Sequence, residues 1–528
     1  MKLNYRRTIF VGFAFFLICA FWQAYDNIIA LTLTNKFGMP QTYSGIIMAF
    51  DNILALFMLP LFGALSDKCR SKMGKRTPFI VIGTILAAVA FVALSFVDNM
   101  QLTNIADVKQ IDSTTSLETL YEYDYGDVEL KTTDGRIYRV TDFEKETFLS
   151  IRTDTKWDLE GNDVTTNENF KGKTISPYSE YVFPARQAYA WHATLHSPNT
   201  LIFFVGLLLV VLIAMSIFRS PAVALMPDVT PKPLRSKGNA IINLMGSAGG
   251  VIVLGLGIVM GTSKATNGLM SYTVFFSIVA VLMIVSLVIF LLTVKENRFV
   301  QDMEEESKRF AIDESNGNDN AGDRKLSRGE ITSLLLILAS VALWYMGYNA
   351  ITSKFSVYAS NVLQQDFNST MIIAQAAAIV SYLPVGMLSS KFGRKKCILA
   401  GVFILGIAFG SAYFVGPGTP ALLMNILFAL AGIGWATINV NSFPMVVELA
   451  KGGNVGKYTG YYYTASMAAQ VLTPFLSGIF MDNIGLTTLF PYATIFVAGS
   501  FATMLFVKHG DSIASPKKEL LENFDIED

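Results

Sequence analysis

The sequence has few charged residues, few cysteines and few histidines for its 528 residues. Charged residues make up only 16% of the chain, whereas a soluble globular protein averages about 25%. Together with a hydrophobic content of 52%, this shortage excludes an ordinary soluble enzyme. The three cysteines, Cys19, Cys69 and Cys397, lie far apart, which excludes a disulfide framework and a CxxC metal motif.

Motifs for catalysis and for cofactors are also missing. The sequence has no Walker loop, no GxSxG elbow and no HExxH motif. His192 and His196 have the i, i+4 spacing of two ligands on one helix face, but no clear third ligand accompanies them. We therefore expect no enzymatic activity, no bound metal and no cofactor. No basic surface suggests a nucleic acid as a partner.

Long apolar stretches dominate the sequence instead. Twelve of them, each about 18–25 residues long, are sufficient to cross the hydrocarbon core of a membrane as a helix. They cover residues 8–31, 45–66, 78–97, 200–218, 238–260, 270–294, 331–353, 370–389, 397–415, 420–446, 458–481 and 487–507. The predicted fold is an all-α membrane protein with three spans in 1–97, three in 200–294 and six in 331–507.

The positions of lysine and arginine predict which ends of these spans face the cytoplasm. Five connections on one side of the membrane contain 18 lysines and arginines, whereas the other side has Lys36, Lys264 and Lys354 outside one long insert. By the positive-inside rule, both termini are expected in the cytoplasm. The predicted location is the plasma membrane, with the first apolar run retained as a span.

Two polar segments interrupt the apolar pattern, and a polar tail ends it. Residues 98–199, with 18 acidic and 10 basic residues, are expected outside the cell. Within them, VELKTTDGRIYRV alternates around Asp134 and Gly135, which predicts a β-hairpin in a small folded cap; a loosely ordered loop is the alternative. Residues 295–330 are expected to be a disordered cytoplasmic linker, and 508–528 a cytoplasmic tail.

A weak internal repeat links the two groups of six spans. Adding 323 to residues 24–26 gives the similar residues 347–349, and adding 220 maps 228–237 on 448–457. The repeat predicts two parallel six-helix halves, with a binding site at their interface near the middle of the membrane.

Two acidic residues fall inside predicted spans. Asp26 in the first span and Asp51 in the second are expected at similar depth, in the outer third of the membrane. A charged side chain there costs about 2.5–3.5 kcal/mol, so a functional role is expected. In a shared cavity, repulsion and desolvation would favour protonation, as a coupling site for H⁺ requires. Alternatively, hydrogen bonds neutralise each carboxylate or each caps a helix end.

Polar and aromatic side chains near these acids form a candidate site for a solute. Amides and aromatic rings together suit a ligand that has both hydroxyl groups and flat apolar faces. The candidates are Trp22, Gln23, Tyr25, Asn27, Asn52, Tyr345, Tyr348, Asn349, Gln375, Trp435, Asn439 and Gln470. For any one of them, interhelical hydrogen bonding or anchoring at the membrane interface is an equal alternative.

Charged residues near the cytoplasmic ends of the spans are candidates for a gate. The segment GALSDKCRSKMGKR (63–76) has a shorter counterpart, GMLSSKFGRKK (386–396). Asp67 is expected to accept hydrogen bonds at a helix N-terminus. Acid–base sets are expected for Asp228 with Lys237 and for the repeat-related Glu448 with Lys457. The alternatives are that the basic residues only set the membrane topology and that the acid–base sets only cap loops. The candidates are Gly63, Asp67, Lys68, Gly74, Lys75, Arg76, Arg219, Asp228, Lys237, Lys391, Arg394, Glu448 and Lys457.

These motifs resemble a known family. GALSDKCRSKMGKRTPFI is similar to the signature between spans two and three of the major facilitator superfamily, in the form found in sucrose transporters and glycoside–pentoside–hexuronide symporters. The resemblance extends through 220–240 and 443–474 and implies alternating access and cation-coupled sugar uptake. The acidic pair of melibiose-type members is replaced by Ala55 and Leu59, so H⁺ is the expected coupling ion and Na⁺ the alternative.

The sequence therefore predicts a secondary active transporter for a sugar or glycoside. Its expected partners are a small-molecule solute and membrane lipid, and the chain is expected to be a monomer. Two alternatives stay open. The first is a membrane sensor whose insert, residues 98–199, binds a ligand or partner, and the second is a transporter for a solute other than a sugar.

Overall fold

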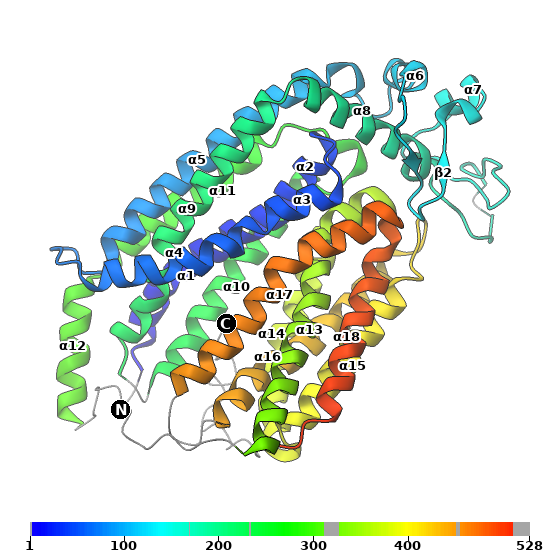
Figure 1. The fold of residues 1–528 in the computed structure, drawn as a ribbon. Coiled ribbons are helices and arrows are strands. Elements are labelled where there is room, and N and C mark those ends of the chain that lie inside the picture. Colours follow the sequence, from blue (N-terminus) through cyan, green and yellow to red (C-terminus); the bar gives the residue numbers. More distant parts are fainter. Residues whose placement is uncertain (1–2, 168, 232–233, 311–326, 450–454, 510–528) are drawn as a thin grey trace.

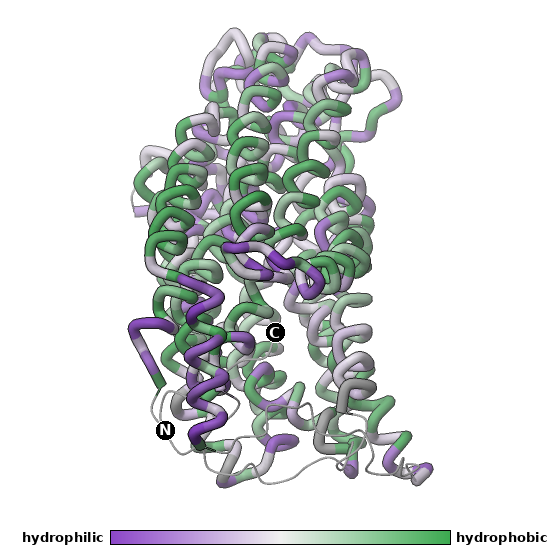
Figure 2. The backbone as a smooth tube through the Cα atoms, turned by 90° about the vertical axis from the view of Figure 1, so that its left-hand side faces the viewer, coloured by the Kyte–Doolittle hydropathy of each residue, from purple (hydrophilic) through white to green (hydrophobic). Residues whose placement is uncertain are grey.

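The computed structural model describes residues 3–509, except 168, 232–233, 311–326 and 450–454. Its main body is a bundle of long helices (Figure 1). Eleven of the described helices are long and apolar enough to cross a membrane, and hydrophobic residues predominate along them (Figure 2). The predicted all-α membrane architecture is confirmed.

The first half of the bundle consists of six spans and one polar helix. The first span contains a π-helical segment, and the second has a break near residue 49. The elements are α1 (Tyr5–Ala24), η1 (Tyr25–Ile29), α2 (Ala30–Asn35), α3 (Gln41–Met48), α4 (Phe50–Asp67), α5 (Thr77–Asn104), α9 (Asn199–Asp228), α10 (Arg235–Met260), α11 (Thr273–Thr293) and the polar α12 (Glu296–Arg309).

The second half also has six long helices. They are α13 (Arg328–Tyr358), continued by η7 (Ala359–Leu363), α14 (Phe367–Phe392), α15 (Arg394–Ala412), α16 (Ala421–Glu448), α17 (Val455–Asn483) and α18 (Leu489–Leu505). The 26-residue α14 lies where the eighth span is predicted, so every predicted span corresponds to a long helix. Most helices continue past the predicted bounds because hydropathy marks only their apolar portion.

The two halves pair their helices in the same way. In the first half α1 packs against α10 and α11, and in the second half the equivalent α13 packs against α17 and α18. The α5–α9 pair corresponds likewise to the α15–α16 pair. Between the halves, α3 packs on α17 and α10 on α14. The structure therefore has the two parallel halves that the weak repeat predicts.

The α3–α17 contact is close enough to require glycine on both helices. A Cβ atom on Gly45 would lie 2.0 Å from the carbonyl oxygen of Pro474. A Cβ atom on Gly478 would lie 2.4 Å from that of Gln41. The two backbones therefore touch at one end of the interface between the halves.

The insert between α5 and α9 has its own small core. Its elements are η2 (Ala106–Val108), α6 (Thr114–Glu122), β1 (Leu130–Lys131), β2 (Ile137–Tyr138), η3 (Val140–Asp142), α7 (Lys145–Ser150), η4 (Tyr178–Val182) and α8 (Phe183–His196). Strands β1 and β2 are antiparallel, with Leu130 opposite Tyr138, which confirms the predicted hairpin. Leu117, Leu120 and Phe148 are buried in this core.

The insert starts later than the sequence suggests. Helix α5 continues to Asn104, so the predicted boundary at 98 lies inside it. The reason is an ion pair: Asp98 contacts Lys36, and both side chains are fully buried. An acidic residue at the end of an apolar run resembles the start of a loop unless its partner is known.

The linker of residues 295–330 is not disordered throughout, and this corrects the prediction for its first part. Helix α12 occupies Glu296–Arg309. Glu296 is 2% exposed, and the carbonyl oxygen of Phe299 accepts a hydrogen bond from Arg7 at 2.9 Å. The polar composition of residues 295–330 gave no indication of these contacts. Residues 311–326 and 510–528 lie outside the described part of the chain.

Candidate functional site

In the described part of the chain, three of the cavities along the interface between the two halves share a lining residue. The largest, about 630 Å³, has Trp22 and Asn239 of the first half and Asn439 of the second in its lining. The others have volumes of about 260 Å³ and 110 Å³. Asp26 lines all three cavities. This carboxylate therefore lies at the junction of the cavity system.

Asp26 and Asp51 share the smallest cavity. Asp51 lines it beside Asn52, whose Nδ2 donates a hydrogen bond to the Asp51 carboxylate at 2.8 Å. Asp26 belongs to the π-helical segment η1, and such wide turns are frequent at functional sites. The sequence suggested a shared cavity from depth alone, and the structure places both carboxylates in one.

Arg219, a gate candidate, lines an interface cavity and lies deeper than the inner loops, and its role in a gate stays a prediction. It lines the 630 Å³ cavity together with Asp26. Its guanidinium carbon is 5.5 Å from the centre of the Trp22 ring, within the range of a cation–π contact. Because α9 continues as one helix to Asp228, Arg219 stays inside the bundle although the apolar run ends before it.

Ten of the twelve residues that are candidates for solute contact line these cavities. They are Trp22, Gln23, Asn27, Asn52, Tyr348, Asn349, Gln375, Trp435, Asn439 and Gln470. Tyr25 instead packs in the core of the first half, where its ring stacks on Phe21. Tyr345 contacts the Trp435 ring edge-on at 5.3 Å, behind the cavity surface.

Two contacts give the site its chemical character. The Nε2 group of Gln375 donates a hydrogen bond to Oε1 of Gln23 at 2.6 Å, which joins the two halves. The rings of Tyr348 and Trp435 lie parallel, 3.7 Å apart and tilted by 3°. The cavity thus has polar amide groups beside a flat aromatic surface, a combination suited to a polyhydroxylated ring.

Some cavity residues were not predicted. On α10, Asn239, Asn243 and Ser247 line the largest cavity, and Thr352 and Tyr382 line the 260 Å³ cavity. The spacing of the α10 residues, i, i+4 and i+8, places them on one helix face. This polar stripe in an apolar span was a usable signal in the sequence.

Hydrogen bonds join the two halves at the end that carries the insert, which we call the outer end. The Lys354 ammonium group donates to the carbonyl oxygen of Gln41 at 2.8 Å and to the Ser44 hydroxyl at 2.7 Å. Asp482 accepts from the backbone N–H groups of Gln41 and Thr42 at 2.8 and 2.7 Å. A carboxylate at the α3 N-terminus is favourable, so these contacts close the outer end.

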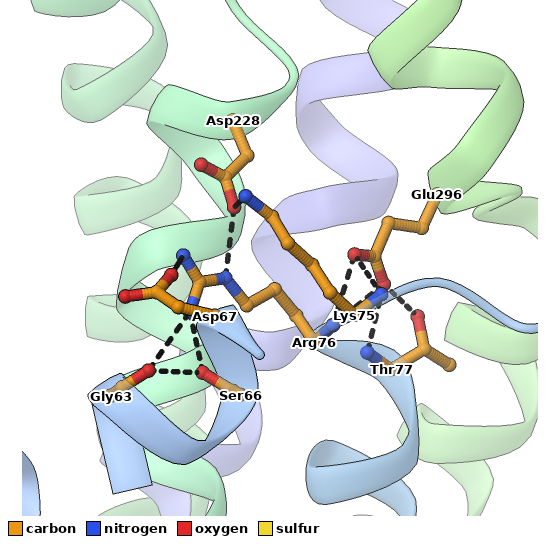
Figure 3. A network of polar contacts seen from close by, with 8 residues as sticks. All are labelled: Gly63, Ser66, Asp67, Lys75, Arg76, Thr77, Asp228 and Glu296. Carbon is orange, nitrogen blue, oxygen red and sulfur yellow. Dashed lines mark hydrogen bonds and ion pairs between the residues drawn. The ribbon is translucent and has the colours of Figure 1, made fainter. Parts of the chain in front are cut away.

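The inner loop between α4 and α5 is held by a charge network (Figure 3). Arg76 forms ion pairs with Asp67 and, at 2.8 Å, with Asp228, which Lys75 also contacts at 3.2 Å. These residues all belong to the first half. The described ion pairs of Asp228 therefore differ from the expected pair with Lys237, because packing of α5 on α9 brings the start of α5 to this carboxylate.

Glu296 performs the capping that was predicted for Asp67. Its carboxylate accepts hydrogen bonds from the backbone N–H groups of Lys75, Arg76 and Thr77 at 2.8–2.9 Å (Figure 3). Gly74 has a φ of +113°, and a Cβ atom there would lie 2.2 Å from Glu296. The correction has a simple cause: the helix that carries Glu296 was expected to be disordered.

The remaining gate candidates lie in different surroundings. The Gly63 carbonyl oxygen accepts a hydrogen bond from Arg76 at 3.4 Å, Lys68 is exposed, and Lys391 lies 5.4 Å from the Phe392 ring centre. Lys237 and Arg394 are half-buried. The side chains of Glu448 and Lys457 lie outside the described part of the chain, so the second acid–base set stays a prediction.

The two spaced histidines lie on helix α8. Their rings are 4.4 Å apart, and the Tyr123 hydroxyl contacts Nδ1 of His192. Within the residues that the structure describes, no group of three potential metal ligands is found.

Comparison with known proteins assigns a family to this architecture. The profile of the Major Facilitator Superfamily matches residues 187–381 and 361–523, and that described as MFS/sugar transport protein matches residues 10–108. A sucrose transport protein of Arabidopsis thaliana is 34% identical over 60 residues, which are 11% of this chain and 12% of that protein. The human proton-associated sugar transporter A is 31% identical over 96 residues, or 18% and 12%. The chain spans less than half the length of the curated relatives it matches.

A solved structure shares the whole fold. The inward-open structure of the xylose transporter XylE from E. coli aligns over 98% of both chains, with a TM-score of 0.55 and 13% identity. At this identity the likeness concerns the fold.

Proposed function

Because the chain belongs to the Major Facilitator Superfamily, we propose that it is a secondary active transporter that moves a sugar or glycoside by alternating access, coupled to H⁺. One observation carries this proposal. Asp26 lies at the junction of three cavities between the halves, beside amide groups and a stacked aromatic pair. Solute and proton would therefore meet at one place.

The surface of the cavity supports a sugar as the solute. The Trp435 ring, stacked on Tyr348, presents a flat apolar surface to the cavity. The Gln23 and Gln375 amides supply donors and acceptors beside it, and Arg219 adds further donors. The two amides already bond each other, but an apolar ligand would leave their remaining hydrogen-bonding capacity unused, at a cost of about 1–3 kcal/mol for each buried group left unpaired.

The two carboxylates support coupling to H⁺. Asp26 and Asp51 line one small cavity, so two negative charges there repel each other and a proton relieves the repulsion. Arg219 lines the adjacent cavity with Asp26 and can attract whichever carboxylate is ionised. Proton binding and solute binding would thus act on the same group of side chains.

The closed outer end supports alternating access. Lys354 and Asp482 tie the second half to α3, while the largest cavity reaches from Asp26 toward Asn439 and Thr459. The arrangement corresponds to one end state of a cycle in which the halves part at one end at a time. The second end state requires the bonds of Lys354 and Asp482 to break.

Counterflow into proteoliposomes tests the proposal. Vesicles loaded with each member of a panel of unlabelled mono- and disaccharides and glycosides would be assayed for uptake of the labelled compound, with proton and sodium gradients imposed separately. We expect saturable counterflow of at least one sugar, and uptake driven by a proton gradient. Binding of a sugar without flux would instead favour a sensor, and flux driven by sodium at constant pH would overturn H⁺ coupling.

A further inference from the structure

We propose that the insert between α5 and α9 is an outer latch that holds the two halves together when the outer end is closed. The proposal rests on the alternating access proposed above. It assigns a function to a segment that belongs to the first half in sequence but contacts the second half in space. The contact is made by the hairpin tip, residues 131–136, and by residues 482–488, which include the last two residues of α17 and the connection to α18 and which we call the α17–α18 loop.

Backbone hydrogen bonds dock the hairpin tip on the α17–α18 loop. The N–H group of Thr487 donates to the carbonyl oxygen of Thr133 at 3.0 Å. The Lys131 ammonium group donates to the Asp482 carbonyl oxygen at 3.1 Å. Asp482 is the residue whose carboxylate caps α3, so the latch and the outer closure meet at one residue.

Two glycines allow this close approach. A Cβ atom on Gly135 would lie 1.7 Å from the Ile484 carbonyl oxygen, and one on Gly485 would lie 2.7 Å from the Thr133 carbonyl oxygen. Both glycines have positive φ, +87° and +134°. Gly161, in the same insert, has an almost equal φ of +90° but no atom within 4 Å of the Cβ position. Close contact, and not turn geometry alone, therefore distinguishes Gly135.

Side chains extend the contact beyond the backbone. Leu486 of the α17–α18 loop packs against the insert core and also against the core of the membrane bundle. Glu180 of η4 accepts a hydrogen bond from the N–H group of Thr133 at 2.9 Å and so fixes the hairpin tip to the rest of the insert. A Cβ atom on Gly418, in another loop of the second half, would lie 2.8 Å from the Thr174 hydroxyl.

The opposite side of the insert is fixed to the first half. Thr194 of α8 donates to the Phe37 carbonyl oxygen at 2.9 Å, and Gln187 donates to that of Met39 at 3.1 Å. Gln101 of α5 donates to Thr194 at 2.8 Å. The insert therefore moves with the first half. When the halves part at the outer end, the contacts at the hairpin tip must break.

The latch predicts how often the outer end opens. A cysteine in place of Ser44, a residue 1% exposed and bonded to Lys354 across the interface, reports the opening. The background carries Cys19→Ser, Cys69→Ser and Cys397→Ser in addition to Ser44→Cys. Intact cells that express this protein are treated with a membrane-impermeant maleimide, and the labelling rate of the cysteine at position 44 is measured by mass spectrometry of its peptide.

Four variants of this reporter protein are compared. Gly135→Ala and Gly485→Ala are expected to raise the labelling rate about fivefold or more. Gly161→Ala is the matched control and should leave the rate unchanged. The double variant Thr133→Cys, Thr487→Cys should form a disulfide on oxidation. This cross-link should lower the labelling rate, and a reductant should restore it. Monodisperse elution of each purified variant shows that it is folded.

The outcomes separate the latch from alternating access. If the reporter reacts in the parent and in Gly161→Ala but equally fast in Gly135→Ala, Gly485→Ala and the cross-linked protein, the latch is refuted and alternating access stands. If the reporter cysteine never reacts in any variant, the outer end does not open, and both proposals fail. If an alanine variant is misfolded, the cross-linked pair alone decides: an oxidised protein that labels at the parent rate refutes the latch.

Discussion

Lys354 of the second half places its ammonium group 2.8 Å from the backbone carbonyl oxygen of Gln41 in the first half. The lysine is 0% exposed, and it also bonds to Oε1 of Gln41 and to the Ser44 hydroxyl. A buried cation needs each of these acceptors because water does not reach it. When the outer end opens, water replaces these hydrogen bonds. The hydration of the Lys354 charge therefore depends on the relative position of the two halves.

Replacement of Lys354 should weaken the outer closure. Lys354→Met removes three hydrogen bonds to Gln41 and Ser44, and a buried acceptor left unpaired costs about 1–3 kcal/mol. Amide hydrogen exchange in α3 is expected to become faster in the variant. Ser353→Ala, which removes only a hydroxyl bonded within its own helix, is the control. Unchanged exchange in α3 would show that Lys354 does not hold the halves together.

Neutralisation of Asp26 should separate solute exchange from proton movement. Asp26→Asn keeps the shape of the side chain but removes the proton site at the junction of the cavities. Uptake driven by a proton gradient is expected to be lost, while counterflow continues. The same measurement on Asp51→Asn tests the second carboxylate of the small cavity. Proton-driven uptake at the parental rate in both variants would contradict the assignment.

Removal of the aromatic surface should weaken solute binding. Trp435→Ala removes the ring that stacks on Tyr348, and a loss of about 1.4 kcal/mol raises Kd tenfold. The Kd of the sugar found by counterflow would be measured by titration. Phe403→Ala, at an exposed position that lines none of the three cavities, should leave Kd unchanged. Equal affinities in both variants would place the solute elsewhere.

Glu296 should contribute more to stability than its exposed neighbours do. Glu296→Ala leaves the N–H groups at the start of α5 without their acceptor, which costs about 1–3 kcal/mol per buried group. A clear fall in Tm is expected. Glu304→Ala, on the exposed face of the same helix, should change Tm little. A similar Tm for both variants would show that the cap adds no stability.

Glu180 should make the insert less stable as the pH rises. Burial raises the pKa of this carboxyl, while hydrogen bonds from Thr133 oppose the shift; Asp134 adds to it and Arg136 lowers it. The stability due to this group is complete below the usual glutamate pKa and is lost as the pH passes the raised value.

Hydrogen exchange at different pH values tests this dependence. Protection factors for residues 130–138, corrected for the intrinsic effect of pH, should fall from acid to neutral pH in the parent. Glu180→Gln cannot ionise and should reduce this fall. Equal pH dependence in both proteins would assign the effect to other groups.

The sequence was sufficient for the architecture because the membrane imposes a simple rule. Apolar runs of sufficient length become spans, and alternation around Asp134 and Gly135 indicated the hairpin. The shared cavity of Asp26 and Asp51 agreed with their predicted depth. These features depend on local pattern or on one coordinate, the position across the membrane.

Contacts between distant charged residues could not be predicted in the same way. Lys36 and Asp98 are both buried, but from the sequence alone each resembles a residue at the end of a span. The Asp228 partners Lys75 and Arg76 depend on which helices are neighbours. Glu296 was missed because its partners are backbone groups, which carry no signature in the sequence.

The docking of the hairpin tip also has a consequence for the synthesis of the protein. Lys131 and Asp482, which meet at the latch, are 351 positions apart in the chain. At about 5–20 residues per second, the ribosome needs roughly 20–70 s to make the second after the first. Throughout that time the insert can fold, but its docking partner does not yet exist. The nascent chain therefore exposes the polar groups of the hairpin tip until residues 482–488 have been made and can cover them.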